Sequence, residues 1–531
     1  MKRKVFVISI LLIVVCFLPL FGGGGRQQQG NAAVQASYPT GRISYPMQTD
    51  VTLTWWTGIA SDLSQNYTSY NDVPSFIGWQ ERTGIKISFL HPPTGGGDEQ
   101  LNLIIASGDL PDIFNYNFIS YPGGPEKAIS DGVILRLNDL INNYAPNLKN
   151  VYSANPQYDR MVKTDTGSYY SFPFIRNDPR NSLYQGLQIR KDWLDELGLA
   201  PPETYDEWHN VLTIFKTKKN SPAPLAIPYG NTSFMYGYGI DSGFYLGNDG
   251  RVLWGRVQPA YKDYLAMMAQ WYKEGLLDPD TATLTTQQIA AKITNGTAGA
   301  AHGTVSGNMG TWIPSGRSVD PRFELRAVSY PVHTKGDRPF LINIDNVFYG
   351  DGVSPSGTTK YPEIAARFLD WGYSDEGYMY HNFGTLGFSY NMVNGIPTYT
   401  DYVFKNPKGW SVAQAIASIA MGKYSGPLLQ SFEFYYQQLI YPEQVAALDI
   451  WSIDDPFKYK LPTLTPTPDE SQEIAAIMSE VNTYATEMMV RFILGTEPLS
   501  NFDNYVNTVR RMGIDRAVEI YNAAVIRYNN R

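Results

Sequence analysis

The stretch EQLNLIIASGDLPDIFNYN, Glu99–Asn117, indicates how this chain folds, because it reads as a helix that turns a tight corner into a strand. Leu101, Ile104 and Ile105 recur at helical spacing, and Gly108 follows them as a residue that commonly ends helices. An apolar pair comes next, as expected of a buried strand. The stretch then closes on a polar, aromatic tail, which does not belong in a core and needs another explanation.

Two strands and a helix precede this stretch. Residues 51–56 alternate and are rich in β-forming side chains. A helix is predicted from Asp72, with Pro74 in its first turn, to Gly84, and IKISFL, residues 85–90, predicts a second strand. With the opening stretch added, the order is strand, helix, strand, helix, strand. Such alternation predicts an α/β fold with a mostly parallel sheet and right-handed crossovers.

The later part of the chain continues this mixture. Thr204 and Glu207 form a capping box before an amphipathic helix, and Asn248-Asp249-Gly250 between apolar flanks predicts a hairpin turn. From about residue 400 the chain is mainly helical, with a long helix around residues 474–481. A length of 531 residues exceeds what one hydrophobic core usually supports, so two or more domains are expected.

Composition narrows the class of partner. Aromatic residues make up 14% of the chain and charged residues 17%, which is below the usual share of roughly 25%. This balance suits a protein that handles a ring-shaped ligand, although aromatic rings also serve as core packing. The formal net charge is −8 and no long run of Lys and Arg follows the first residues, so nucleic acid is not expected as a partner.

The first residues differ from the rest of the chain. MKRK is followed by a short apolar run and by small residues, the pattern of a secretory signal peptide rather than of a spanning helix. We expect residues 1–24 to be a signal peptide, residues 25–45 to be a flexible tether, and the protein to be exported to the periplasm or cell surface. Cys16, the only cysteine, permits no disulfide within the chain. It reads as an apolar residue of the signal, with a lipid-anchor cysteine as the alternative.

Signatures of catalysis and metal binding are scarce. The chain has no H-E-x-x-H, G-x-S-x-G, phosphate-binding loop or dinucleotide fingerprint, and its five histidines are scattered without ligand spacing. We therefore expect no catalytic residue, no metal and no cofactor. A secreted carbohydrate-active enzyme stays open as an alternative, because the carboxylate pair that cleaves glycosidic bonds is set by the fold and not by sequence spacing.

Aromatic or polar residues recur just after apolar runs. Trp55 and Trp56 close the first strand, Tyr116 closes the third, Tyr229 follows LAIP, and Trp312 ends a run of small residues. Ligands of open α/β sheets bind outside the carboxyl ends of the strands, and a glycan site uses aromatic faces together with polar side chains. Four such clusters favour one shared cleft. The alternative is that each ring packs at a sheet edge.

Seven segments, taken together in this order, carry a resemblance to a known family. They are FIGWQERTGIKISF, LIIASGDLPDIFNY, ILRLNDLINNYAPN, LQIRKDWLDELGL, WYKEGLLDP, FLDWGYSDEGYMYHNFGTLG and GIDRAVEIYNAAVIRY. With them the chain resembles bacterial extracellular solute-binding proteins of ABC importers, the family-one group that contains maltose-binding protein. The likeness is closer to the large branch of that group, which is linked to the uptake of polysaccharide fragments.

The resemblance implies a two-lobed periplasmic-binding-protein fold, α/β in each lobe, with a hinge and a ligand cleft between the lobes. Lobe one would comprise residues 46–173 and 350–387, and lobe two residues 188–342 and 391–531. Crossovers between the lobes would lie near residues 172–187, 341–350 and 385–391. Closure of such a hinge moves few residues and is stabilised by a ligand that touches both lobes.

The resemblance also implies ligand contacts. Carried over to this sequence, they are Trp55, Trp56, Tyr116, Asn117, Tyr229, Asn308 and Trp312, with Asn382 and Tyr390 at a crossover. Arg190, at a helix start near the hinge, is expected to be structural. Relatives that bind acidic polysaccharide often carry a calcium loop, but the corresponding segment here, KNSPAPLAIP, has no acidic residue. We therefore expect no calcium site.

The sequence thus predicts an exported, monomeric binding protein that captures an oligosaccharide by lobe closure and delivers it to the permease subunits of an ABC transporter. Peptides or another polar solute are alternative ligands, because aromatic clefts also accept those. The secreted enzyme and a ligand-sensing partner of a membrane receptor also stay open as functions. Contact with the membrane would come through the permease or the lipid anchor.

Overall fold

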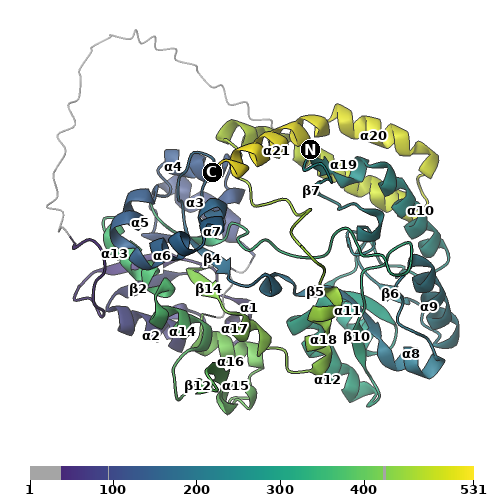
Figure 1. Ribbon diagram of the computed structural model, residues 1–531, viewed down its shortest axis with the longest axis horizontal. Coiled ribbons are helices and arrows are strands. Elements are labelled where there is room, and N and C mark those ends of the chain that lie inside the picture. The colour runs from purple at the N-terminus through teal and green to yellow at the C-terminus, as the bar shows by residue number, and fades with distance from the viewer. Residues whose placement is uncertain (1–37, 94, 422–425) are drawn as a thin grey trace, which may run out of the picture. The chain divides into compact units, whose positions relative to one another are not determined.

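The computed structural model describes residues 38–93, 95–421 and 426–531 (Figure 1). Within these residues, Thr40–Arg531 form one unit that holds two main β-sheets, called here the first and the second sheet. The predicted signal peptide, with Cys16, and residues 25–37 of the predicted tether lie outside the described residues.

The first sheet has six strands. In order across the sheet they are β14 (Leu428–Gln430), β4 (Phe172–Arg176), β11 (Gly352–Pro355), β3 (Ile113–Asn115), β1 (Thr52–Trp56) and β2 (Lys86–Leu90). β1 is parallel to both of its neighbours, β2 and β3. β11 runs antiparallel between β3 and β4, and β14 is parallel to β4. The predicted alternation is therefore confirmed for the first three strands, and β11 makes the sheet mixed.

Helices α2 (Pro74–Thr83) and α3 (Gly97–Ser107) connect these three strands, as the sequence predicts. Each ends at a glycine in the left-handed conformation, Gly84 at φ 72° and Gly108 at φ 73°, and each glycine N–H donates to a carbonyl of the last helical turn. The other helices between and around these strands are α1 (Ser61–Ser64), α4 (Gly124–Ser130), α5 (Asn138–Tyr144), α6 (Pro146–Ala154), α7 (Pro156–Val162), α13 (Pro362–Asp370), α14 (Asp375–Phe383), α15 (Asp401–Phe404), α16 (Val412–Ile419) and α17 (Phe432–Tyr436).

The second sheet has four strands in the order β10 (Leu325–Ala327), β5 (Gln185–Arg190), β9 (Ala300–Thr304) and β6 (Leu225–Ala226). β5 is antiparallel to both neighbours, and β6 and β9 are parallel, so this sheet departs from the mostly parallel expectation. The helices of this part are α8 (Lys191–Leu197), α9 (Tyr205–Lys218), α10 (Pro259–Lys273), α11 (Thr286–Thr294), α12 (Gly310–Val319) and α18 (Pro442–Trp451).

Two local predictions are confirmed. Thr204 Oγ1 accepts a hydrogen bond from the backbone N–H of Glu207 at 3.2 Å, and the Glu207 carboxylate accepts from the Thr204 N–H at 3.1 Å, which is the capping box at the start of α9. The turn at residues 248–250 joins strands β7 (Phe244–Leu246) and β8 (Val252–Trp254). A second hairpin, of β12 (Tyr390–Val393) and β13 (Ile396–Tyr399), follows α14.

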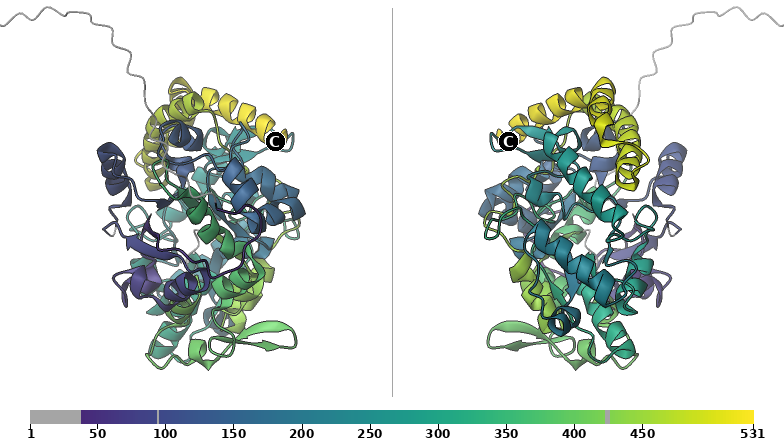
Figure 2. Two further views of the ribbon diagram at one scale, coloured as in Figure 1. Left: turned by 90° about the vertical axis from the view of Figure 1, so that its left-hand side faces the viewer. Right: turned by 90° about the vertical axis from the view of Figure 1, so that its right-hand side faces the viewer.

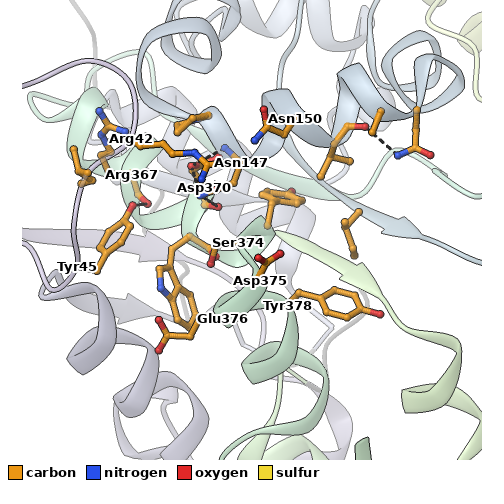
Figure 3. A pocket seen from close by; sticks show the side chains of 18 residues that line it. Arg42, Tyr45, Asn147, Asn150, Arg367, Asp370, Ser374, Asp375, Glu376 and Tyr378 are labelled. Atoms are coloured by element: carbon orange, nitrogen blue, oxygen red, sulfur yellow. Dashed lines mark hydrogen bonds between the residues drawn. The ribbon is translucent and has the colours of Figure 1, made fainter. Parts of the chain in front are cut away.

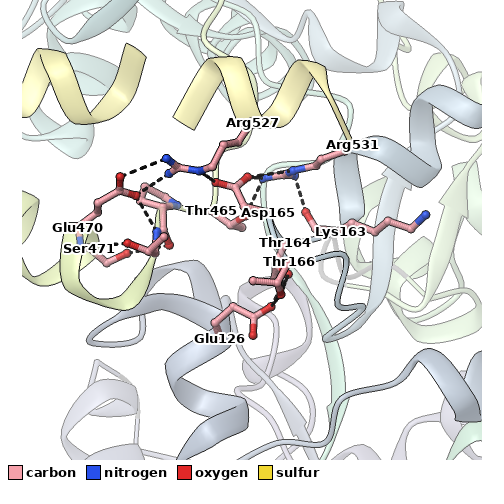
Figure 4. A network of polar contacts seen from close by, with 12 residues as sticks. Glu126, Lys163, Thr164, Asp165, Thr166, Thr465, Glu470, Ser471, Arg527 and Arg531 are labelled. Atoms are coloured by element: carbon pink, nitrogen blue, oxygen red, sulfur yellow. Dashed lines mark hydrogen bonds and ion pairs between the residues drawn. The ribbon is translucent and has the colours of Figure 1, made fainter. Parts of the chain in front are cut away.

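The chain closes with three helices, α19 (Pro468–Leu494), α20 (Phe502–Arg511) and α21 (Ile514–Asn529). α19 confirms the long helix predicted around residues 474–481 and packs along α10. Charged side chains bind these helices to the loop between α7 and β4. Asp165 pairs with both Arg527 and Arg531, and Arg527 also pairs with Glu470 (Figure 4). The C-terminal helices therefore contact the helices of the second sheet, through α10, and a loop that leads into the first sheet, through Asp165.

The chain passes from the first sheet to the second between β4 and β5, and it returns between β10 and β11. After β14 it leaves the first sheet, and α18 then packs on β10. This corrects the lobe assignment for residues 428–430, which belong to the first sheet and not to lobe two, so the last passage does not lie at 385–391. The place of β14 is set by its pairing with the sequence-distant strand β4, which no local signal marks. The other lobe boundaries stay a prediction.

Residues 41–45, predicted to be part of a flexible tether, are instead held against helices of the first sheet. The Arg367 guanidinium donates to the carbonyl O of Gly41, and the Tyr45 hydroxyl donates to the carbonyl O of Arg367 at 2.8 Å. Gly41 N–H also donates to the carbonyl O of Asn143 at 2.8 Å. Arg367 is buried and needs acceptors for its donors, which explains why this segment is bound.

Candidate functional site

A pocket of about 370 Å³ lies where the passages between the sheets meet the strand ends. Its lining combines aromatic rings with amide, hydroxyl and charged groups. The lining residues are Arg176, Asn181, Tyr184, Thr304, Ser306, Gly307, Asp345, Tyr349, Gln430 and Tyr435.

Both sheets contribute strand ends to this pocket. Arg176 is the last residue of β4 and Gln430 the last of β14, the parallel pair of the first sheet. Thr304 is the last residue of β9 in the second sheet. The carboxyl ends of strands are where open α/β sheets bind ligands, so the position of the pocket matches a ligand site.

Two opposite charges meet in the pocket. Arg176 Nη2 lies 3.0 Å from Asp345 Oδ2, and Arg176 Nη1 donates to the carbonyl O of Asn346 at 3.1 Å. The guanidinium also lies 4.9 Å from the centre of the Tyr349 ring. Arg176 and Asp345 are the two charged residues among the ten that line the pocket. The cation is therefore already paired, and the lining carries no net charge.

Tyrosine hydroxyls and rings line the same space. Burial and the neighbouring Asp345 carboxylate raise the pKa of Tyr184 to about 12, so this hydroxyl keeps its proton at neutral pH. The Tyr435 hydroxyl donates to the carbonyl O of Leu183 at 3.3 Å, which fixes the ring at the pocket wall. Neutral tyrosines offer both an apolar face and a hydrogen-bonding group to a ligand.

Two buried amide oxygens add acceptors. Asn181 Oδ1 and Gln430 Oε1 have no hydrogen-bond partner among the described residues, whereas the Asn181 amide donates to the carbonyl O of Gln430 at 3.0 Å. A buried acceptor without a donor costs free energy. Hydroxyl groups of a bound ligand would supply the missing donors.

The three tryptophans predicted to touch ligand are buried in the cores and do not line this pocket. Trp55 packs edge to face against Trp79, with ring centres 5.6 Å apart. Trp56 Nε1 donates to Gln100 Oε1 at 2.8 Å. Trp312 lies buried against the backbone of Gly303. In this structure the three rings therefore pack in the cores, which is the alternative to a shared ligand cleft.

Three more predicted contacts do not line the pocket. Asn117 and Asn308 contact residues that line it, whereas Tyr116 contacts α3. The Asn117 amide donates to the carbonyl O of Tyr349 at 3.2 Å, and Asn308 Oδ1 accepts from the Thr304 N–H at 2.8 Å. Both amides thus support residues that do line the pocket. Tyr116 is half-buried, and its hydroxyl donates to a carboxylate of α3 at 3.3 Å.

The remaining predicted contacts lie elsewhere. Asn382 is buried, and its Oδ1 accepts from the Ser431 N–H at 2.8 Å, which joins α14 to the start of α17. Tyr390 packs on Phe383 at the base of β12. Tyr229 is half-buried and lines a separate pocket beside α19. The nine predicted residues are therefore not brought together in one pocket.

None of the lining residues was predicted as a ligand contact, although half of them lie in segments that the sequence marks as crossovers. Arg176, Asn181 and Tyr184 lie within the predicted crossover 172–187, and two more lie within 341–350. The concentration of Arg, Asn, Asp and Tyr in these segments was the available signal.

Arg190 behaves as expected of a structural charge, since it is buried and pairs with the carboxylate of Asp192, the second residue after it, at 2.6 Å.

A second cavity, of about 590 Å³, lies on helices of the first sheet, beside α6 and α14 (Figure 3). Its buried Asp370 carboxylate accepts from the backbone N–H of Asn147 at 3.2 Å and of Leu148 at 2.8 Å, at the start of α6. Burial raises the pKa of Asp370 to about 7. These bonds cap a helix, and no buried polar atom without a partner belongs to the described lining of this cavity. The first pocket is therefore the candidate site.

The described residues offer neither a metal cluster nor a membrane span. No three His, Cys, Asp or Glu side chains between residues 38 and 531, the gaps aside, are grouped so that they could hold a metal ion. In the same ranges no helix combines the length and apolar character needed to span a membrane.

Comparison with known proteins places the chain among binding proteins. The family model for bacterial extracellular solute-binding proteins matches residues 63–379, more than half of the chain. The fructooligosaccharide ABC transporter substrate-binding protein FusA of Streptococcus pneumoniae is 25% identical over 549 aligned residues, which cover 97% of this chain and 96% of FusA.

Solved structures have the same architecture. The alginate-binding protein AlgQ2 aligns with a TM-score of 0.74 at 25% identity, over 92% of this chain and 100% of AlgQ2. The structure of S. pneumoniae FusA in complex with kestose aligns with a TM-score of 0.72 at 21% identity, over 90% of this chain and 100% of FusA. These likenesses confirm the predicted two-lobed α/β fold.

Proposed function

Because the chain belongs to the family of bacterial extracellular solute-binding proteins, we propose that it captures a neutral oligosaccharide in the pocket of Arg176 and Asp345. Capture occurs by closure of two lobes, the first lobe being the first sheet with its helices and the second lobe the second sheet with its helices. The protein is exported through its predicted signal peptide, acts as a monomer, and delivers the ligand to the membrane subunits of an ABC transporter.

The observation that carries this proposal is the composition of the pocket. Tyrosine rings can stack on the C–H faces of sugar rings, while the amide oxygens of Asn181 and Gln430 and the hydroxyls of Thr304 and Ser306 can bond sugar hydroxyls. Gln430 ends a strand of the first sheet and Thr304 ends a strand of the second. A ligand held there touches both lobes and so stabilises the closed arrangement.

The ion pair supports a neutral ligand rather than an acidic one. An oligosaccharide with carboxylate groups needs cations that are free to bind it, and the single cation of the lining is already bound to Asp345 and to the backbone of Asn346. FusA, aligned over nearly the whole chain, is named for fructooligosaccharide, whereas AlgQ2 is named for alginate. The pocket chemistry favours the first kind of ligand for this chain.

Binding without cleavage fits the same residues better than hydrolysis. Glycoside hydrolysis generally uses two carboxyl groups that face each other across the bond, roughly 5–10 Å apart. The lining of this pocket supplies one carboxylate, Asp345, and an arginine holds it. FusA and AlgQ2 are both named as binding proteins.

Calorimetry on the purified protein without its signal peptide tests the proposal. The panel would hold kestose, stachyose, alginate oligomers, galacturonate oligomers and a peptide mixture. We expect a neutral oligosaccharide to bind and to raise the melting temperature, since ligand at 100 times its Kd adds about 2.7 kcal/mol of stability. Binding of the uronate oligomers or peptides in preference to every neutral sugar would overturn the assignment, as would the release of shorter sugars during incubation.

A pair of variants locates the binding to the pocket. Tyr184→Ala removes a lining ring, and Tyr229→Ala removes a half-buried ring of the separate pocket beside α19. We expect the first to weaken binding at least tenfold and the second to leave it unchanged. The reverse result would place the ligand in the other pocket.

A further inference from the structure

The β12–β13 hairpin is an exposed, uncharged element that the binding function does not explain. The stretch GTLGFSYNMVNGIPTYT, Gly384–Thr400, contains no Asp, Glu, Lys or Arg. Tyr390 and Tyr399 anchor its base on Phe383, while the outer part projects from the molecule as the green hairpin at the lower end of both views in Figure 2.

Apolar side chains are exposed over this element. They are Leu386, Phe388, Met392, Val393 and Ile396, each about half or more exposed. Two further apolar residues are exposed nearby in the sequence: Tyr436 ends α17, and Ile440 lies on the segment that leads from α17 toward the second lobe. Large apolar patches exposed on a soluble protein commonly mark interaction sites.

Hydrogen bonds join the hairpin to the segment that lines the ligand pocket. Gln437, one residue after α17, accepts from the Tyr399 N–H at 2.9 Å and donates to the carbonyl O of Pro397 at 2.8 Å. Two residues earlier, Tyr435 forms part of the pocket wall. The hairpin and the pocket are therefore attached to the same short segment, between the first lobe and the second.

We propose that the β12–β13 hairpin, with Tyr436 and Ile440, is the surface that docks on an apolar extracytoplasmic face of the membrane subunits of the transporter. This inference rests on the proposed function, which supplies such a partner. A partner that receives ligand must distinguish loaded from empty protein, and a surface attached to the segment of Tyr435 is placed to report on the pocket.

Two other occupants fit the observations less well. The turn at the tip consists of Asn394 and Gly395, both at positive φ, so a polar amide would enter a lipid bilayer first. Nearby Lys405 pairs with Asp401 at 3.0 Å and offers little attraction to anionic lipid. A second copy of the chain would leave the link between the hairpin and the pocket segment without a use, because self-association need not distinguish loaded from empty protein.

Photo-crosslinking in the cells that make the protein tests the docking surface without requiring a known ligand. A benzophenone amino acid replaces Val393 in one protein and Leu103, which is 70% exposed on α3, in a matched control. We expect an adduct from position 393 with a membrane subunit of an ABC transporter, and none from position 103. An adduct with a second copy, with lipid or with another class of protein, or no adduct, would overturn the proposal.

A binding measurement with purified protein provides the second readout. Val393→Thr with Ile396→Thr keeps β-forming side chains but removes apolar contact, and Leu103→Thr is the control. Binding to membranes from the producing cells should fall roughly tenfold for the double variant only. Vesicles of phosphatidylethanolamine and phosphatidylglycerol should bind none of the proteins. Binding to these vesicles would mean that the hairpin docks on lipid and not on the transporter.

The two proposals fail in different ways. If the purified protein binds an oligosaccharide but position 393 gives no transporter adduct, the docking surface is wrong and the binding function stands. If no oligosaccharide binds, the proposed function fails whatever the hairpin contacts. Unchanged calorimetric affinity of the double variant for any sugar found in the panel separates docking from capture.

Discussion

In the pocket between the two sheets, Arg176 Nη2 and Asp345 Oδ2 lie 3.0 Å apart, and this ion pair joins the end of β4 to the segment that returns from the second sheet. The pair thus has two roles in the proposed site. It neutralises the pocket, and it links two of the passages between the sheets.

Asp345→Asn should change the preferred ligand. The substitution removes the carboxylate that pairs with Arg176 and leaves a cation in the pocket, which attracts carboxylate groups of a sugar. We expect galacturonate oligomers to gain affinity relative to a neutral oligosaccharide, roughly tenfold or about 1.4 kcal/mol. Calorimetry of both ligands on both proteins measures the ratio, and an unchanged ratio would contradict the assigned role of the pair.

Trp312→Ala should destabilise the protein rather than remove a ligand contact. The ring is 2% exposed and packed in the core of the second lobe, and truncation of a buried tryptophan costs about 3–5 kcal/mol. Chemical denaturation measures the loss. Tyr229→Ala, at a half-buried ring, is the control and should cost less. A stable Trp312→Ala protein with weakened ligand binding would restore the tryptophan to the site.

His381 should make the protein sensitive to acid. Burial among Trp79 and Trp371 lowers the pKa of His381 from 6.5 to about 3. Between these values the unfolded chain binds more protons than the folded one, so stability rises with pH in that range and falls as the pH drops below about 6.5. The free energy of unfolding changes by up to about 1.4 kcal/mol per pH unit in this range.

The difference between His381→Phe and the unsubstituted protein isolates this effect. Phe keeps a ring in the aromatic cluster but does not titrate. Urea denaturation at pH 7.5 and pH 5 should show the variant gaining stability relative to the unsubstituted protein at the lower pH. If the stability difference between the two proteins is the same at pH 7.5 and pH 5, His381 does not cause the acid sensitivity.

Asp165→Asn should loosen the C-terminal helices. The Asp165 carboxylate is 5% exposed and pairs with both Arg527 and Arg531. Its loss leaves the buried Arg531 guanidinium without its anion, whereas Arg527 keeps Glu470. Removing one partner of a buried pair costs about 3–5 kcal/mol. Hydrogen exchange should increase in the last two turns of α21. Lys405→Gln breaks the exposed pair with Asp401 and should have no measurable effect.

The sequence predicts those elements whose signals are local. The glycine stops at Gly84 and Gly108, the capping box of Thr204 and the turn at 248–250 all depend on neighbours within a few residues, and all are present. β14 was not predicted, because its place is set by pairing with β4, which lies far from it in the sequence.

The pocket shows why site residues are harder to predict than elements. A tryptophan after an apolar strand is as compatible with the core as with a cleft, and Trp55 shows that a following helix can cover it. Gln430 and Asp345 lie far apart in the sequence and meet only because β14 and the segment before β11 converge. Such convergence is a property of the tertiary fold.

The strand order of the two sheets has a consequence for how the chain folds. Every strand of the second sheet falls between residues 185 and 327, whereas the first sheet needs strands that run from residue 52 to residue 430. Pairing distant strands requires closing long loops, which slows folding. The second sheet can therefore assemble while the first still waits for β14, although the first sheet begins earlier in the chain.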